Sequence, residues 1–129
     1  MTHRIADIPQ EAWSGLLRVG FWRSDREPEL PDPREHIAPD WPEDDRARLI
    51  EYLEASYMMP YFQPGSSWCR CGCSPQPPDI GTQDLTDGTW VFPEGFAHYV
   101  RVHRVKPCEE FLVHVRELNY TMPRVPVLA

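Results

Sequence analysis

Fifteen prolines are spread along this chain of 129 residues and limit what it can fold into. A proline fixes its own φ, lacks a backbone N–H and disfavours the helical conformation of the residue before it. Coiled coils and bundles of long helices are therefore excluded. A hydrophobic content of 41% is too high for a disordered chain. The sequence predicts one domain spanning 1–129, with a proline-rich acidic loop at 24–40 and an extended C-terminal tail at 119–129.

The residues between the prolines predict an α+β fold, in which a small antiparallel sheet packs against about three helices. The clearest helical pattern covers 42–55, where an Asp40-x-x-Glu43 start and a proline in the first turn precede an apolar stripe. An Asp87-Gly88 turn between two apolar runs predicts a hairpin. The other expected elements are helices near 9–14, 94–104 and 107–118, and strands near 16–22, 57–62, 66–71, 83–86 and 89–92.

The net charge of −7 belongs to one segment of the chain. Residues 24–54 contain eleven acidic and four basic side chains, whereas the rest of the chain is balanced. Because the prolines of 24–40 stiffen this segment, we interpret it as a rigid acidic surface for a basic protein partner. The carboxylates assigned to that surface are Glu29, Asp32, Asp44, Asp45 and Glu51. Two other interpretations remain open: an ordinary solvated face, or contact with the basic stretch at 95–108 of the same molecule.

These features predict a non-enzymatic protein that binds another protein, for example an immunity or inhibitor protein or an accessory subunit. The acidic charge argues against nucleic acid as a partner, because the phosphate backbone would repel it. The chain has no signal-peptide pattern and no apolar run near the roughly 20 residues of a membrane span, so we expect a cytoplasmic protein without a membrane partner. No catalytic motif is present, and no catalytic residue is assigned.

Three cysteines at alternate positions suggest a metal site. On a strand they would lie on one face, about 7 Å apart, which is too far for a tetrahedral zinc ion with sulfur ligands at about 2.3 Å. The chain would therefore have to curl after Cys71. The predicted zinc ligands are Cys69, Cys71, Cys73 and His98, with Cys108 or His103 as other sources of the fourth ligand. A small zinc-binding domain, with or without catalysis, is thus the alternative function. Partly buried free thiols or disulfides formed by oxidation are the competing interpretations.

The histidines allow more than one role. His98 and His103 are five residues apart and do not share one face of an ideal helix. His103 falls on the apolar stripe of its predicted helix and is interpreted as a core histidine, whereas His98 lies off that stripe. A third hypothesis is a small-molecule enzyme that uses His98 with Asp84 or Glu94. The positions of these acids in a hairpin and at a helix start favour a structural role instead.

Several sequence patterns resemble those of a known family. They are Leu30-Pro-Asp-Pro-Arg-Glu-His36, Ser67-Trp-Cys-Arg70, Asp84-Leu-Thr-Asp-Gly-Thr-Trp-Val-Phe-Pro-Glu-Gly95 and His98-Tyr-Val100. Together they resemble a family of small bacterial proteins, common in actinobacteria, over about residues 28–118. The resemblance implies a soluble bacterial protein; the family has no established activity, so no catalytic role carries over. The three alternating cysteines depart from the family pattern, which has one or two cysteines near Cys69.

Overall fold

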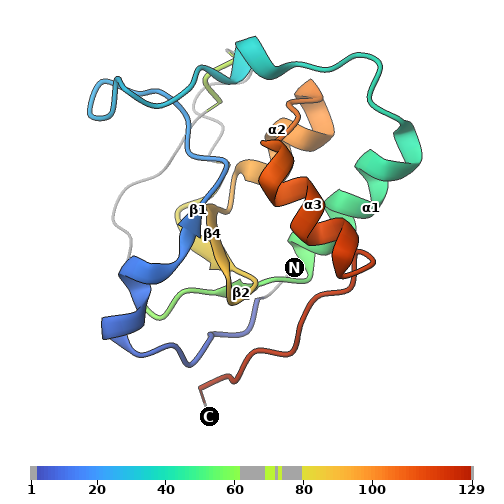
Figure 1. The fold of residues 1–129 in the computed structure, drawn as a ribbon. Coiled ribbons are helices and arrows are strands. Elements are labelled where there is room, and N and C mark those ends of the chain that lie inside the picture. Colours follow the sequence, from blue (N-terminus) through green and yellow to red (C-terminus); the bar gives the residue numbers. More distant parts are fainter. Residues whose placement is uncertain (1–2, 62–68, 72, 74–79, 129) are drawn as a thin grey trace.

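The computed structural model describes residues 3–61, 69–71, 73 and 80–128 (Figure 1). The predicted α+β class is confirmed: within these residues a four-stranded sheet has the order β1-β4-β3-β2, and three α-helices lie together on one side of it (Figure 1). No described helix has the length and apolar character needed to cross a membrane. The elements in chain order are η1 (Gln10–Gly15), β1 (Leu17–Arg18), η2 (Pro33–His36), α1 (Glu43–Glu54), β2 (Tyr57–Met58), β3 (Asp84–Thr86), β4 (Trp90–Pro93), α2 (Phe96–His103) and α3 (Glu109–Glu117).

The predicted hairpin forms the centre of the sheet. Strands β3 and β4 pair in antiparallel register, with Leu85 opposite Phe92, and β2 adds an antiparallel edge to β3. Gly88 has a φ of +97°, which explains why the turn requires glycine there. The other edge departs from the antiparallel expectation, because β1 pairs with β4 in parallel, with Leu17 opposite Trp90. The sheet is therefore mixed.

Two of the predicted strands are much shorter than expected. Of 16–22 only Leu17–Arg18 is a strand, and of 57–62 only Tyr57–Met58 within the described residues. Gly20 turns the chain after β1 with a φ of +79°, and a Cβ there would lie 2.6 Å from the Phe96 ring. Glycine thus lets the backbone pass directly over a core aromatic ring, and the strand ends before it.

The strand predicted at 66–71 is wrong in the part that can be assessed. Residues 66–68 lie outside the described residues, Cys69 belongs to no strand, and Arg70 and Cys71 form a turn. The backbone N–H of Arg70 donates to the Tyr99 hydroxyl at 2.7 Å, so a helix side chain rather than a neighbouring strand satisfies it. This turn determines where the cysteine side chains point.

The α1 helix confirms the clearest helical prediction but begins differently. Its N-cap residue is Pro42, and no side chain caps it, so the expected Asp40-x-x-Glu43 capping pair does not form. The Glu43 carboxylate instead accepts hydrogen bonds from Arg46 and from Arg104 of the α2 C-cap. Glu43 therefore joins two helices rather than closing the start of one.

The acidic loop at 24–40 is not extended throughout, because it contains η2. Asp32 caps this short helix by accepting the backbone N–H of Arg34 at 3.0 Å. The Arg34 guanidinium donates to both carboxylate oxygens of Asp32, and these hydrogen bonds lower the pKa of that carboxyl to about 2. One carboxylate of the predicted acidic surface is thus already paired with a neighbouring arginine.

Aromatic side chains fill the core between the sheet and the helices. Phe92 of β4, Phe96 of α2 and Phe111 of α3 are fully buried, with ring centroids 5.9–6.0 Å apart. Trp90 meets Phe111 edge to face at 5.3 Å. Such pairs add about 0.5–1.5 kcal/mol each beyond the area that they bury. This aromatic cluster fixes α2 against the hairpin and so determines the position of the side chains that α2 carries.

The segments near the two ends of the chain run side by side, at residues 5–7 and 126–128. Ala6 forms an antiparallel bridge with Val127, and the Leu128 N–H donates to the Ile5 carbonyl at 3.0 Å. On the other side of the N-terminal segment, Ile5 bridges Met58 of β2 in parallel. The C-terminal tail is thus held by backbone hydrogen bonds as well as by side chains.

Candidate metal centre

Two cysteines and two histidines converge at the start and end of α2. The nearest ligand atoms of Cys69, Cys73, His98 and His103 all lie within 4.8 Å of one another. The Sγ of Cys69 lies 3.1 Å from Nε2 of His103, and the Sγ of Cys73 lies 3.3 Å from Nε2 of His98. Cys69 is 2% exposed, and the other three side chains are partly buried. The cluster is therefore placed at the edge of the core.

Helix α2 supplies both imidazoles from opposite ends. His98 lies in its first turn and His103 is its last residue, about 140° apart around an ideal helix. Their ring centroids nevertheless approach to 5.3 Å, with the Tyr99 ring beside both. The two imidazole rings therefore approach each other although their Cα atoms lie on different sides of the helix.

The spacing of the four ligand atoms is near that around a tetrahedral metal ion. With sulfur at about 2.3 Å and nitrogen at about 2.0–2.1 Å from zinc, neighbouring ligand atoms are about 3.3–3.8 Å apart. The two measured S···N separations of 3.1 and 3.3 Å and the 4.8 Å limit for all pairs come close to these values. Two thiolates and two imidazoles are a donor set that zinc accepts in closed structural sites.

The surroundings of the cluster favour the neutral forms of Cys73 and His98. Burial, together with a hydrogen bond to Cys69, raises the pKa of the Cys73 thiol. Burial and the neighbouring His103 and Arg101 lower the pKa of His98. A divalent cation in the cluster would attract thiolate and neutral imidazole ligands.

The structure brings together only part of the predicted ligand set. Cys71 is not a member of the four-residue cluster, and burial raises the pKa of its thiol to about 11. Cys108, the N-cap residue of α3, is exposed and also not a member. His103, named from the sequence as another source of the fourth ligand, is the fourth member of the cluster. The turn at Arg70 and Cys71 explains the difference, because it returns Cys73 towards Cys69.

The acids proposed to act with His98 have other hydrogen-bond partners in the structure. One carboxylate oxygen of Glu94 accepts the backbone N–H groups of Thr82 and Gln83 at 3.2 and 3.3 Å. Asp84 accepts a hydrogen bond from the Tyr61 hydroxyl, and burial raises the pKa of this carboxyl. A cavity of about 600 Å³ is lined by both His98 and Glu94, but not by Asp84. The carboxylates thus have structural partners.

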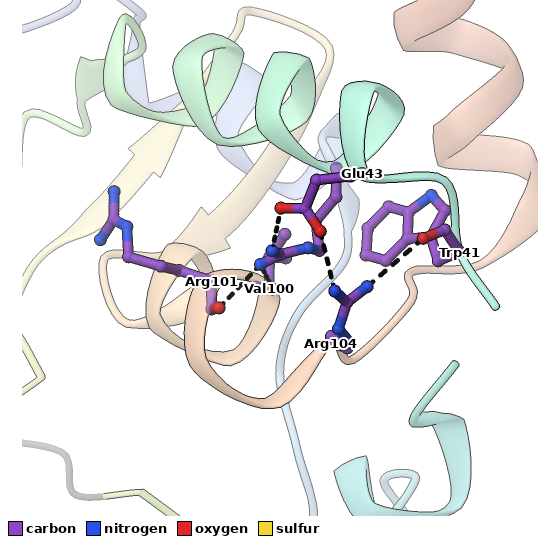
Figure 2. Close-up of polar contacts among 6 residues, drawn as sticks. Trp41, Glu43, Val100, Arg101 and Arg104 are labelled. Atoms are coloured by element: carbon purple, nitrogen blue, oxygen red, sulfur yellow. Dashed lines mark hydrogen bonds and ion pairs between the residues drawn. The ribbon is translucent and has the colours of Figure 1, made fainter. Parts of the chain in front are cut away.

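Part of the acidic segment contacts α2 in the same molecule (Figure 2). Glu43 accepts from Arg104 at 2.7 Å, and Glu54 pairs with Arg101. Arg46 donates to the carbonyls of Val100 and Arg101 at 3.2 and 2.7 Å, near the helix C-terminus where carbonyls lack partners. The internal contact considered for the acidic segment is therefore present for these residues.

The remaining carboxylates of the predicted partner surface differ in exposure. Glu29, Asp44 and Glu51 are exposed, and Asp45 is partly buried. Within the described ranges no ion pair involves these four carboxylates. Their role in binding a basic protein stays a prediction.

Comparison with models of known protein families, with curated proteins and with solved structures finds no match to this chain. The resemblance to the actinobacterial family therefore stays an expectation from the sequence patterns alone. The candidate metal centre rests on its own geometry.

Proposed function

We propose that this protein is a small zinc-binding domain in which Cys69, Cys73, His98 and His103 hold a structural zinc ion. The observation that carries the proposal is the convergence of their four ligand atoms within 4.8 Å of one another. Four protein ligands leave no open position for substrate or water, which distinguishes structural from catalytic zinc sites. The zinc would attach the segment of the two cysteines to both ends of α2.

The neighbouring contacts support a structural role for the ion. The cysteine segment contributes no strand within the described residues, so the sheet does not hold it. Arg70 contributes two hydrogen bonds to its attachment, from its N–H to the Tyr99 hydroxyl and, more weakly, from its Nε to the Arg23 carbonyl at 3.4 Å. A metal ion would hold this segment in place of the inter-strand hydrogen bonds that a strand would provide.

We expect one zinc ion per chain when the protein is purified with zinc and without chelators. Cys73→Ser should reduce the zinc content at least tenfold, because a hydroxyl is a poor zinc ligand. Cys71→Ser and Cys108→Ser are matched controls that should keep about one equivalent, since neither residue belongs to the cluster. Elemental analysis together with native mass spectrometry measures this directly. Wild-type protein without zinc, or equal loss in Cys71→Ser, would contradict the proposal.

Replacing zinc by cobalt tests the ligand set. Tetrahedral Co²⁺ with two thiolates gives visible d–d bands and a sulfur charge-transfer band in the near ultraviolet. We expect both in the wild type and in Cys71→Ser. His103→Ala should weaken and shift the d–d bands while keeping the charge-transfer band, because both sulfurs remain. An unchanged spectrum in His103→Ala would show that this imidazole is not a ligand.

Binding of a basic protein partner is a second candidate function. It is favoured by the exposed carboxylates of Asp44 and Glu51, which have no ion pair among the described residues. Reversing Asp44, Asp45 and Glu51 to lysine should abolish capture of a basic partner from an extract of the source cells. The Glu11→Lys, Glu110→Lys, Glu117→Lys variant, which reverses three exposed carboxylates outside the acidic segment, is the charge-matched control. Quantitative mass spectrometry that finds the same captured proteins with all three baits would reject this candidate.

A further inference from the structure

A second cavity, of about 200 Å³, lies between the segment after β1 and the link from α2 to α3. None of the four candidate zinc ligands lines it. Its apolar wall is formed by Val19, Phe21, Trp22, Leu30, Pro31 and Pro107. The cations Arg18 and Lys106 also line it, whereas no carboxylate does. The cavity therefore combines an apolar interior with positively charged side chains and no negative ones.

Trp22 contributes a buried hydrogen-bond donor without a partner. The residue is 9% exposed, and its Nε1 makes no hydrogen bond in the structure. An indole N–H can only donate, and an unmet buried donor costs about 1–3 kcal/mol. The ring itself is fixed, because it packs edge to face on Tyr99 at 6.0 Å. The Trp22 ring therefore forms a rigid apolar wall of the cavity.

Lys106 is the only lysine of the chain and is held at the cavity by its backbone. Its N–H donates to the His36 carbonyl at 2.9 Å, and His36 lines the same cavity. The partly buried ammonium has no ion pair in the described part of the chain. Arg18 already has partners, since its guanidinium stacks on the Phe21 ring at 4.2 Å and forms an ion pair with Glu27 at 3.5 Å. Lys106 is thus the cation left for a ligand.

We propose that this cavity binds a small organic acid, whose flat apolar body packs between Trp22 and Pro107 and whose carboxylate contacts Lys106. The volume is below the roughly 300–1,000 Å³ of pockets for drug-sized ligands, so the ligand is of single-ring size. The Lys106 ammonium is a charged donor, which matches the acceptor-only chemistry of a carboxylate. The proposal does not depend on zinc.

The single lysine provides a specific probe. Reductive dimethylation with ¹³C-formaldehyde keeps the positive charge and labels only Lys106 and the N-terminus, which gives two NMR signals. We expect phenylacetate to shift the Lys106 signal in a saturable way at millimolar concentration, and the N-terminal signal to stay. Phenylacetamide, phenethylamine and acetate are controls that lack the charge, reverse it or lack the ring. Each should bind at least fivefold more weakly. Equal binding of phenylacetate and phenylacetamide would overturn the proposal.

Substitutions distinguish binding of the ligand in this cavity from its attraction to the positive charges of the protein in general. Lys106→Met keeps the apolar stem but removes the charge, and should weaken phenylacetate binding about tenfold in calorimetry. Arg124→Met, which removes an exposed cation that does not line this cavity, should leave the affinity unchanged. Trp22→Ala should weaken binding several-fold through loss of the apolar wall that the indole provides. The proposal is wrong if the two charge-removing variants bind alike, or if phenylacetate produces no saturable shift at Lys106.

Discussion

Removal of zinc is expected to lower the thermal unfolding midpoint of this protein by about 15 °C. A ligand that is present at a thousand times its Kd stabilises the folded state by about 4 kcal/mol. In a domain of this size each kcal/mol corresponds to roughly 3–5 °C. The effect is smaller than in a zinc finger, which unfolds without metal, because the aromatic core around Phe92 and Phe111 does not depend on the ion.

The measurement is circular dichroism or calorimetry with and without a strong chelator. Cys73→Ser should unfold near the midpoint of the chelated wild type and should no longer respond to the chelator. Cys71→Ser should still show the full decrease. A wild-type midpoint that moves by less than about 2 °C, in protein shown to contain one zinc ion, would mean that the metal does not stabilise the fold.

Replacing Asp87 should cause the largest loss of stability of any single carboxylate in the described chain. Its side chain is completely buried and accepts four hydrogen bonds. The donors are the Tyr52 hydroxyl at 2.5 Å, His114 Nε2 at 2.9 Å, and the backbone N–H groups of Thr89 and Trp90 at 2.9 and 2.8 Å. Asp87→Ala leaves all four donors without their acceptor, so we expect a loss of about 3–5 kcal/mol.

Urea unfolding of zinc-saturated protein measures this loss. Tyr52→Phe removes only one of the four donors and should cost about 1 kcal/mol. Asp44→Ala, at an exposed position of α1, is the control and should change the free energy of unfolding by less than about 0.5 kcal/mol. If Asp87→Ala unfolds within 1 kcal/mol of the wild type, the network does not stabilise the fold as described.

The elements that the sequence predicted well depend on local chemistry. Helix α1 follows from its apolar stripe, and the β3–β4 hairpin follows from the Asp87-Gly88 turn. The parallel pairing of β1 with β4 could not be predicted, because it joins residues more than seventy positions apart with no local signal. The burial of Asp87 was missed for the same reason, since its partners Tyr52 and His114 come from two helices.

The candidate metal centre was predicted only in part. Cys69, Cys73 and His98 were recognised as ligand types, because cysteine and histidine are the usual donors to zinc. His103 was named only as another source of the fourth ligand, and Cys71 was included in the predicted set, because the turn at Arg70 that breaks the alternation expected of a strand has no local sequence signal.

The sequence alone determined that this chain folds into short elements. Fifteen prolines interrupt regular backbone, and enough apolar side chains remain between them to form a core. Only the tertiary structure decided which of its polar groups meet. Glu43 pairs with Arg104, and Cys69 and Cys73 meet two histidines, because packing of α1 and of the cysteine segment on α2 brings distant residues within a few ångströms. Proline acts on its own residue and its neighbour, whereas these contacts require the whole core to form first.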